Sequence, residues 1–151
     1  MDEEGGTEAQ QMIKDIRRFR LAFTTLVNRR MVKYGINVPQ CTVLALLGET
    51  KETTMGALSD AIGTTMGAAT NLVDRLVHAG HVKREHDKDD RRIVRVMLTP
   101  QGRELLDRVY AEGETFFARL LSEIKPEDRQ TFFQVYEKLT QLMQETLLQG
   151  E

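Results

Sequence analysis

The chain has 151 residues, of which 40% are hydrophobic and 29% charged, a formal net charge of −2 and one cysteine. This length suits a single domain with its own core, and the lone cysteine excludes an internal disulfide and a cysteine-rich zinc site. The first residues are acidic, and no apolar stretch reaches the roughly 18 residues of a membrane span, so we expect a cytoplasmic protein without a signal peptide.

The first fifty residues predict two helices. Thr7 begins a capping box, and apolar residues at spacings of three and four predict a long amphipathic helix over residues 7–35 that Gly35 ends. A second capping box follows at Asn37, with a proline in the first turn of a helix that should end near Gly48. Cys41 lies on the apolar stripe of this second helix, and we interpret it as a buried, unreactive thiol.

Two shorter helices joined by a tight turn come next. Thr54 can cap a helix over residues 55–62, and Gly63 breaks the chain before a helix over residues 66–78. In this fourth helix the apolar residues fall on one face: Ala69, Leu72, Val73 and Leu76. The opposite face is small and polar near its start, so we expect it to project away from the core.

A β-hairpin and two more helices complete the chain. Residues 82–86 and 93–98 alternate in hydropathy and predict two strands, and residues 87–92 between them are too charged to be buried. Thr99, followed by a proline, caps a fifth helix, and Pro126 opens the sixth. The predicted order is four helices, a two-stranded wing and two helices.

Charge and apolar residues are distributed unevenly. Residues 64–103 carry eight basic and five acidic residues, a net charge of +3, whereas residues 104–151 carry a net charge of −5. A basic middle suits a surface that faces phosphate. The first helix and the last two carry more apolar surface than a core over residues 40–100 can cover, so we expect two copies to pair.

Several segments share the pattern of one known family: ALSDAIG at 57–63, LVDRL at 72–76, AGHVKR at 79–84, DKDDRR at 87–92 and LTPQG at 98–102. Through them the chain resembles the MarR family of bacterial regulators over nearly its whole length. The resemblance implies a mainly α, α+β winged helix-turn-helix fold, with about six helices and a two-stranded wing, as one domain over residues 1–151. Within it, residues 36–100 would form the DNA-binding lobe, and residues 7–35 and 100–148 the dimerisation helices.

The fourth helix is the predicted recognition helix. A helix N-terminus with small polar side chains can enter the major groove, where base edges are distinguishable. The base-facing candidates are Met66, Gly67, Thr70 and Asn71. Thr65 can offer its hydroxyl or backbone N–H to a phosphate; the alternative is that Thr65 and Thr70 only cap and solvate a surface helix. Arg75 and Arg84 are either phosphate contacts or internal salt-bridge partners.

The predicted wing tip carries a second candidate site. The family uses an Asp-x-Arg arrangement there, and the resemblance places it on Asp90 and Arg92, with Arg92 in the minor groove and Asp90 orienting it. A planar, weakly hydrated guanidinium suits the negative potential of a narrow minor groove. Arg91 is the accompanying phosphate contact. For an arbitrary turn, solvation alone would explain these charges, but their position after a helix-turn-helix favours DNA binding.

The resemblance also implies a small aromatic or phenolic effector that releases DNA. Apolar Phe23 and Val27, with Arg30 or Tyr34 as a polar anchor, are candidates to line its site, and ordinary core packing is the competing interpretation.

Other chemistry has little support in the sequence. His78, His81 and His86 lack the further ligands of a tetrahedral zinc site, so we expect no metal and no cofactor. Neither a Ser/His/Asp set nor a carboxylate pair indicates an enzyme. The sequence therefore predicts a homodimeric DNA-binding transcriptional regulator, a repressor of a pseudo-palindromic operator. The main alternative is a winged-helix module for protein–protein interaction or dimerisation without sequence-specific DNA binding, and a small-molecule enzyme comes third.

Overall fold

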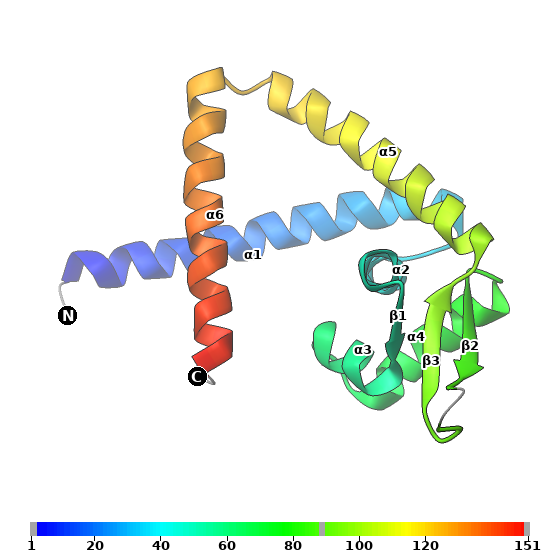
Figure 1. The fold of residues 1–151 in the computed structure, drawn as a ribbon. Coiled ribbons are helices and arrows are strands. Elements are labelled where there is room, and N and C mark those ends of the chain that lie inside the picture. Colours follow the sequence, from blue (N-terminus) through cyan, green and yellow to red (C-terminus); the bar gives the residue numbers. More distant parts are fainter. Residues whose placement is uncertain (1–2, 88–89, 150–151) are drawn as a thin grey trace. The chain divides into compact units, whose positions relative to one another are not determined.

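The computed structural model describes residues 3–87 and 90–149, which form six α-helices, a short 3-10 helix and three strands (Figure 1). In chain order these are α1 (Glu3–Met31), η1 (Val32–Tyr34), α2 (Val38–Thr50), β1 (Glu52–Thr54), α3 (Met55–Ala61), α4 (Met66–His78), β2 (Val82–His86), β3 (Val94–Leu98), α5 (Pro100–Ser122) and α6 (Pro126–Gln149). Two compact units divide within α5, Met1–Val109 and Tyr110–Glu151. The expected six helices with a β wing are confirmed.

The first helix begins earlier than its capping box predicted. α1 starts at Glu3, so Thr7 lies within the helix and does not begin it. Acidic residues near a helix N-terminus are favourable, so the sequence before Thr7 can continue the helix. The α-helix ends at Met31, and the 3-10 helix η1 continues the chain to Gly35, where the predicted glycine stop lies: Gly35 has a φ of 67°, and its N–H donates to the carbonyl of Val32 at 3.0 Å. Glycine suits this left-handed position because it has no Cβ.

Local side-chain caps begin the next helices as predicted. At α2, Asn37 Oδ1 accepts from the backbone N–H of Gln40 at 3.0 Å, and Gln40 Oε1 accepts from the N–H of Asn37 at 3.0 Å. The hydroxyls at the starts of α3, α4 and α5 each accept from the N–H three residues later, over 3.3 Å at Thr54, 3.2 Å at Thr65 and 3.0 Å at Thr99. These hydrogen bonds satisfy N–H groups that a helix start leaves unpaired.

The predicted hairpin of β2 and β3 is confirmed, and the sheet also has a third strand, β1, that the sequence did not predict. Its order is β1-β3-β2, and both pairings are antiparallel. β1 pairs Thr53 with Val96 of β3, more than forty residues away in sequence. Three residues are too few to show an alternating pattern, and this strand exists because of its distant partner. α2 ends at Thr50, two residues beyond Gly48, and β3 begins at Val94, one residue later than expected.

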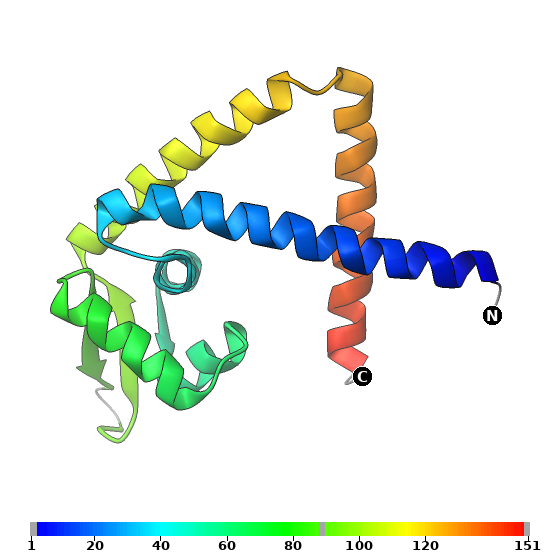
Figure 2. The same ribbon diagram turned by 180° about the vertical axis from the view of Figure 1, so that it is seen from behind.

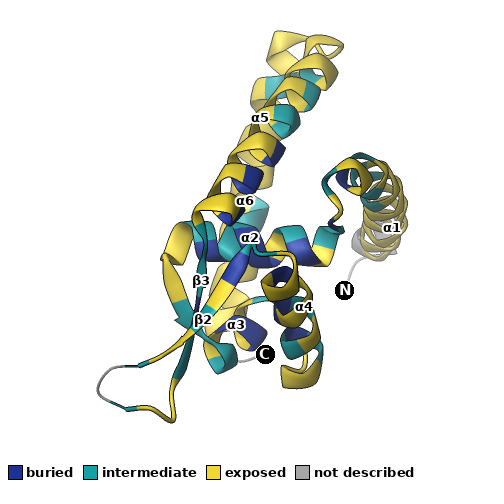
Figure 3. Cartoon of the chain, turned by 90° about the vertical axis from the view of Figure 1, so that its right-hand side faces the viewer, coloured by how far each residue is buried: buried dark blue, intermediate teal, exposed yellow. Residues whose placement is uncertain are grey.

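One apolar core holds the first unit together. Its fully buried side chains come from α2, α3, α4, β2, β3 and the start of α5, and include Leu44, Leu47, Leu58, Val73, Leu76, Val82, Val96, Leu105 and Leu106. Figure 3 shows these buried positions along the inner faces of α2 and α4. The predicted inner face of α4 is therefore confirmed, although Leu72 is only half-buried. Half-buried Cys41 packs against this core, and burial raises the pKa of its thiol.

Large apolar side chains also lie exposed on both units. α6 has no buried residue among those described, and its ring pair Phe132 and Tyr136 stacks at 5.8 Å while both remain exposed. On α1, Phe19 and Leu21 are 69% and 70% exposed. The surplus of apolar surface that the sequence predicted is present in each unit. Within the described ranges, no helix is both long enough and apolar enough to cross a membrane.

The start of α5 is locked against the turn that links α4 to β2. Thr99 Oγ1 donates to the carbonyl of Gly80 at 2.6 Å, and the N–H of Thr99 donates to the carbonyl of His81 at 3.0 Å. A Cβ added to Gly102 would lie only 1.9 Å from the carbonyl oxygen of His81. Only glycine permits this approach, which joins the first turn of α5 to the lobe that carries α4 and the wing.

We predict that Gly102→Ala lowers the free energy of unfolding by about 3 kcal/mol, because the added methyl group must displace backbone. Gly113→Ala is the matched control, since a Cβ at Gly113 meets nothing within 4 Å and should raise helix stability by about 0.5–1 kcal/mol. Urea unfolding followed by circular dichroism measures both. Equal effects of the two substitutions would contradict the close approach.

The burial of His81 predicts that the folding stability of the protein falls at acidic pH. Its Nδ1 atom is buried without a hydrogen-bond partner among the described residues, and burial, with the nearby charge of Arg108, lowers the pKa of His81 below its ordinary value of 6.5. The unfolded chain then binds a proton more readily than the folded one, so stability should fall as the pH drops through 6.5 toward the lower folded value.

Unfolding free energies at about pH 7 and about pH 5 test this expectation. In His81→Gln, the unfolding free energy should drop less between these two pH values than in the wild type. In His78→Gln, which keeps His81, the drop should equal that of the wild type. An identical pH dependence in wild type and His81→Gln would show that His81 does not contribute.

Candidate nucleic-acid interface

Helix α4, the predicted recognition helix, is held by the turn before it and by the core beneath it. Gly63 has a φ of 62°, and the N–H of Thr64 donates to the carbonyl of Ser59 at 3.0 Å, which closes the α3–α4 turn. α4 then packs against α2, α3 and β2 (Figure 2). With its apolar side fixed in this way, the direction of its outer face is set.

The predicted base-facing residues all lie on this outer face. Met66, Gly67 and Asn71 are exposed, and a Cβ at Gly67 would meet nothing within 4 Å. Thr70 is half-buried, and its Oγ1 donates to the carbonyl of Met66 at 2.8 Å, so the hydroxyl is left as an acceptor. Thr65 uses its Oγ1 as an acceptor for the helix cap, which leaves its proton for an outside acceptor such as a phosphate oxygen.

The structure separates the two arginines whose roles the sequence left open. Arg84 of β2 forms an ion pair with Asp74 of α4, so it ties the wing strand to the recognition helix. Arg75 lies exposed on the outer surface of α4. The geometry therefore favours an internal salt bridge for Arg84 and leaves Arg75 as the phosphate candidate.

At the wing tip, Asp90 and Arg92 form a bidentate ion pair. Arg92 Nε donates to Asp90 Oδ1 at 3.1 Å and Nη2 to Oδ2 at 3.0 Å, and the backbone N–H of Arg92 donates to Oδ1 at 3.0 Å. Hydrogen bonding from Arg92 lowers the pKa of Asp90, and the carboxylate raises the pKa of Arg92. Although the Arg92 side chain is 91% exposed, it is charged and already directed before any partner arrives.

Further short hydrogen bonds join the described residues on the two sides of the loop. The N–H of Asp87 donates to the carbonyl of Ile93, and the N–H of Ile93 donates to the carbonyl of Asp90, both at 2.9 Å. Nδ1 of His86 donates to the carbonyl of Arg91 at 2.8 Å, while the Arg91 side chain stays exposed. Figure 3 shows the hairpin of β2 and β3 projecting away from the helices of the lobe.

Sequence reasoning missed the side chains that hold the base of the wing. Arg95 Nε donates to Asp87 Oδ2 at 2.6 Å, and its Nη1 donates to Glu52 Oε1 at 2.9 Å. Arg95 had counted only toward the net charge, and Glu52 was overlooked because β1 was not predicted. The available signal was an arginine in an otherwise apolar strand that follows an acidic turn.

The predicted effector residues lie together on the segment from α1 to η1, and all four are half-buried. Val27 and Tyr34 pack against the core, as ordinary core residues would. The Phe23 ring stacks on Phe19 at 5.8 Å, and the Arg108 guanidinium lies 6.0 Å from the centre of the Tyr34 ring. Arg30 shares their partial burial.

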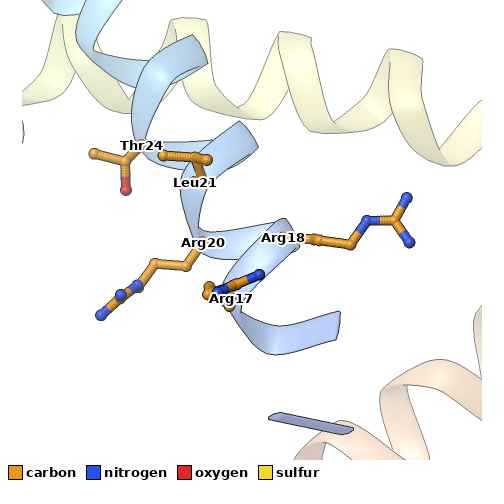
Figure 4. Close-up of a pocket in the computed structure, with 5 residues that line it drawn as sticks. All are labelled: Arg17, Arg18, Arg20, Leu21 and Thr24. Carbon is orange, nitrogen blue, oxygen red and sulfur yellow. The ribbon is translucent and has the colours of Figure 1, made fainter. Parts of the chain in front are cut away.

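A hollow on α1 lies nearer its N-terminus and is lined by other residues: Arg17, Arg18, Arg20, Leu21 and Thr24. Arg18 and Arg20 point away from one another (Figure 4), so these side chains do not converge on a common ligand position. The three histidines lie at separate places, at the end of α4, before β2 and at the end of β2. Within the part of the chain that the structure describes, no group of three or more possible metal ligands lies together.

Comparison with known proteins identifies a matching family model and similar curated proteins. The family model described as MarR family matches residues 36–94, from before α2 to the first residue of β3. The uncharacterized HTH-type transcriptional regulator YfiV of Bacillus subtilis is 33% identical over 109 residues, which cover 72% of this chain and 66% of YfiV. The HTH-type transcriptional repressor MdtR of the same organism is 26% identical over 137 residues, 88% of each chain.

A solved structure shows the same fold. A mutant of MarR from E. coli, complexed with operator DNA, matches with a TM-score of 0.74 at 23% identity, over 87% of this chain and 95% of that one. The chain spans just under two thirds of the length of YfiV, and the matched segment contains the α3–α4 pair and the wing loop. Residues 36–94 of the chain therefore match the MarR family, and the chain shares the fold of a solved MarR structure.

Proposed function

We propose that this chain is a homodimeric transcriptional repressor that binds a pseudo-palindromic operator. The observation that carries the proposal is the bidentate Asp90–Arg92 ion pair at the tip of the wing. A guanidinium held in one direction at an exposed tip suits insertion into a narrow minor groove, where the potential is most negative. The carboxylate reduces the orientational freedom that Arg92 would otherwise lose on binding.

The outer face of α4 supports a major-groove contact beside the wing. The major groove is about 12 Å wide and admits a helix. Small residues at the start of α4 allow its backbone to come near the base edges, and exposed Met66 offers an apolar contact for a thymine methyl group. Arg75 and Arg91 lie exposed for phosphate contacts, which set the register of the protein on DNA.

The dimer part of the proposal rests on the exposed apolar surface of the terminal helices. We assign DNA binding to residues 36–100 and dimerisation to residues 7–35 and 100–148. Two recognition helices in a symmetric dimer would meet half-sites about one helical turn apart, which is why we expect a pseudo-palindrome. Repression agrees with the name of MdtR, a transcriptional repressor similar to this chain.

The remaining parts of the proposal follow from DNA binding. The protein acts in the cytoplasm, with DNA as its partner, and has no catalytic role. We also propose that a small aromatic or phenolic effector binds beside Phe23, Val27, Arg30 and Tyr34. It would weaken operator binding by favouring a dimer in which the recognition helices do not match the half-site spacing. The competing function is a protein-binding winged helix, and DNA-binding measurements separate the two.

We predict that Arg92→Ala weakens operator binding roughly tenfold or more and lowers the slope of affinity against salt, because a groove contact and its counterion release are lost. Fluorescence anisotropy with the intergenic duplex upstream of the protein's own gene measures both. Urea unfolding should be unchanged, since the Arg92 side chain is 91% exposed.

Arg119→Ala is the control, because it removes an exposed arginine of α5 that lies outside the proposed lobe. Its affinity should match that of the wild type. If Arg92→Ala left the affinity and the salt slope unchanged, the wing assignment would be wrong. If the wild type bound specific and random duplexes equally, the regulator proposal would fail as a whole.

For the dimer, we predict a sedimentation mass twice the 17.3 kDa of one chain. Replacing exposed Phe132 and Tyr136 by glutamate should shift the equilibrium toward monomer by placing charge in an apolar interface. Gln134→Glu adds a charge at a polar position of the same helix and serves as control. A wild-type monomer at all concentrations would contradict the dimer proposal.

A further inference from the structure

We propose that Arg95 is a positioning residue for DNA recognition, which anchors the wing loop to strand β1 so that Arg92 meets the groove in one direction. The inference rests on the proposed function for its effect on DNA binding. Its structural part, the anchoring of the loop, concerns the free protein and is tested without DNA.

A continuous set of hydrogen bonds leads from the sheet to the tip. Arg95 Nη1 donates to Glu52 of β1 at 2.9 Å, and Nε donates to Oδ2 of Asp87 at 2.6 Å, where the loop begins. The other oxygen of Asp87, Oδ1, accepts from the backbone N–H of Asp90 at 3.1 Å. Asp90 then holds Arg92 through both carboxylate oxygens. Each link fixes the group that carries the next.

The position of Arg95 in the sheet explains why it can reach both carboxylates. β3 is the central strand, and Arg95 pairs with Thr54 on one side and with Glu85 on the other. The planar guanidinium offers several donors in fixed directions, so one side chain can serve two acceptors, which a lysine ammonium does with far less directional control. The two carboxylates raise the pKa of Arg95.

Burial distinguishes the base of the wing from its tip. The Asp87 side chain is only 14% exposed and that of Arg95 is 37% exposed, compared with 91% for Arg92. Removing Arg95 would leave the carboxylates of Asp87 and Glu52 without the cation between them. Like charges repel and a shielded carboxylate gains by hydration, so the loop should move outward and lose its fixed direction.

A double-mutant cycle tests the coupling. Wild type, Arg95→Met, Arg92→Ala and the double variant are compared by anisotropy with the upstream intergenic duplex. We expect Arg95→Met to weaken binding about tenfold alone and less than about twofold when Arg92 is already alanine. Losses that add independently would indicate a direct phosphate contact by Arg95 and would overturn the positioning role, as would an unchanged affinity in Arg95→Met.

Glu52→Gln and Arg95→Lys refine the cycle. Glu52→Gln keeps the size of the side chain but removes the charge that anchors Arg95 to β1, and it should give a smaller loss of affinity in the same direction. Arg95→Lys keeps the positive charge but lacks the branched guanidinium that reaches both carboxylates, so we expect a substantial loss of DNA affinity. A DNA affinity of Arg95→Lys equal to that of the wild type would show that the charge alone suffices and would overturn the inference. Arg119→Met is the control for removing an exposed cation.

Amide hydrogen exchange on the free protein gives the second readout. In Arg95→Met, the amides of Asp90, Arg92 and Ile93 should exchange faster than in the wild type, while core amides such as that of Val96 and the urea midpoint stay unchanged. A general rise in exchange would instead show a structural role and overturn the inference. If the wild type failed to bind DNA specifically, the proposed function would fall, and this exchange measurement would still decide whether Arg95 holds the loop.

Discussion

Strand β3 is the element on which the proposed DNA-binding lobe depends. It pairs with β1 on one side and β2 on the other, and it buries Val96 completely in the core. Because successive side chains of a strand point to opposite faces, Arg95 faces away from that core and can hold the wing. Directly after β3, Thr99 begins α5 and contacts the turn between α4 and β2. The recognition helix, the wing and α5 thus share one support.

The two parts of the proposed interface, α4 and the wing tip, are stabilised by different means. α4 is placed by apolar burial of Val73 and Leu76, a large and non-directional contribution that holds the helix firmly. The wing tip has little to bury, so its direction comes from hydrogen bonds between charged groups. Such exposed pairs contribute little to folding stability. Their value lies in directing a charge before binding.

The net charge of the chain says little about its binding surface. The positive middle segment is offset by the acidic C-terminal part, and a sum over the whole chain hides both. At the wing, several acidic residues accompany the arginines, and those that the structure describes act as acceptors that aim them: Asp87 holds Arg95, and Asp90 holds Arg92. The acidic residues therefore serve the cationic site, although they lower its formal charge.

The sequence alone determined the features that depend on near neighbours. The caps at Asn37, Thr65 and Thr99, the glycine stop at Gly35 and the buried face of α4 follow from patterns a few residues long, because a helix start satisfies its own N–H groups locally. The Asp90–Arg92 pair, predicted from the resemblance, likewise joins residues two apart. Only the tertiary structure decided β1, the Asp74–Arg84 pair, the Arg95 anchor and the need for glycine at position 102. Each of these joins segments that the fold alone brings together, so no local pattern could announce them.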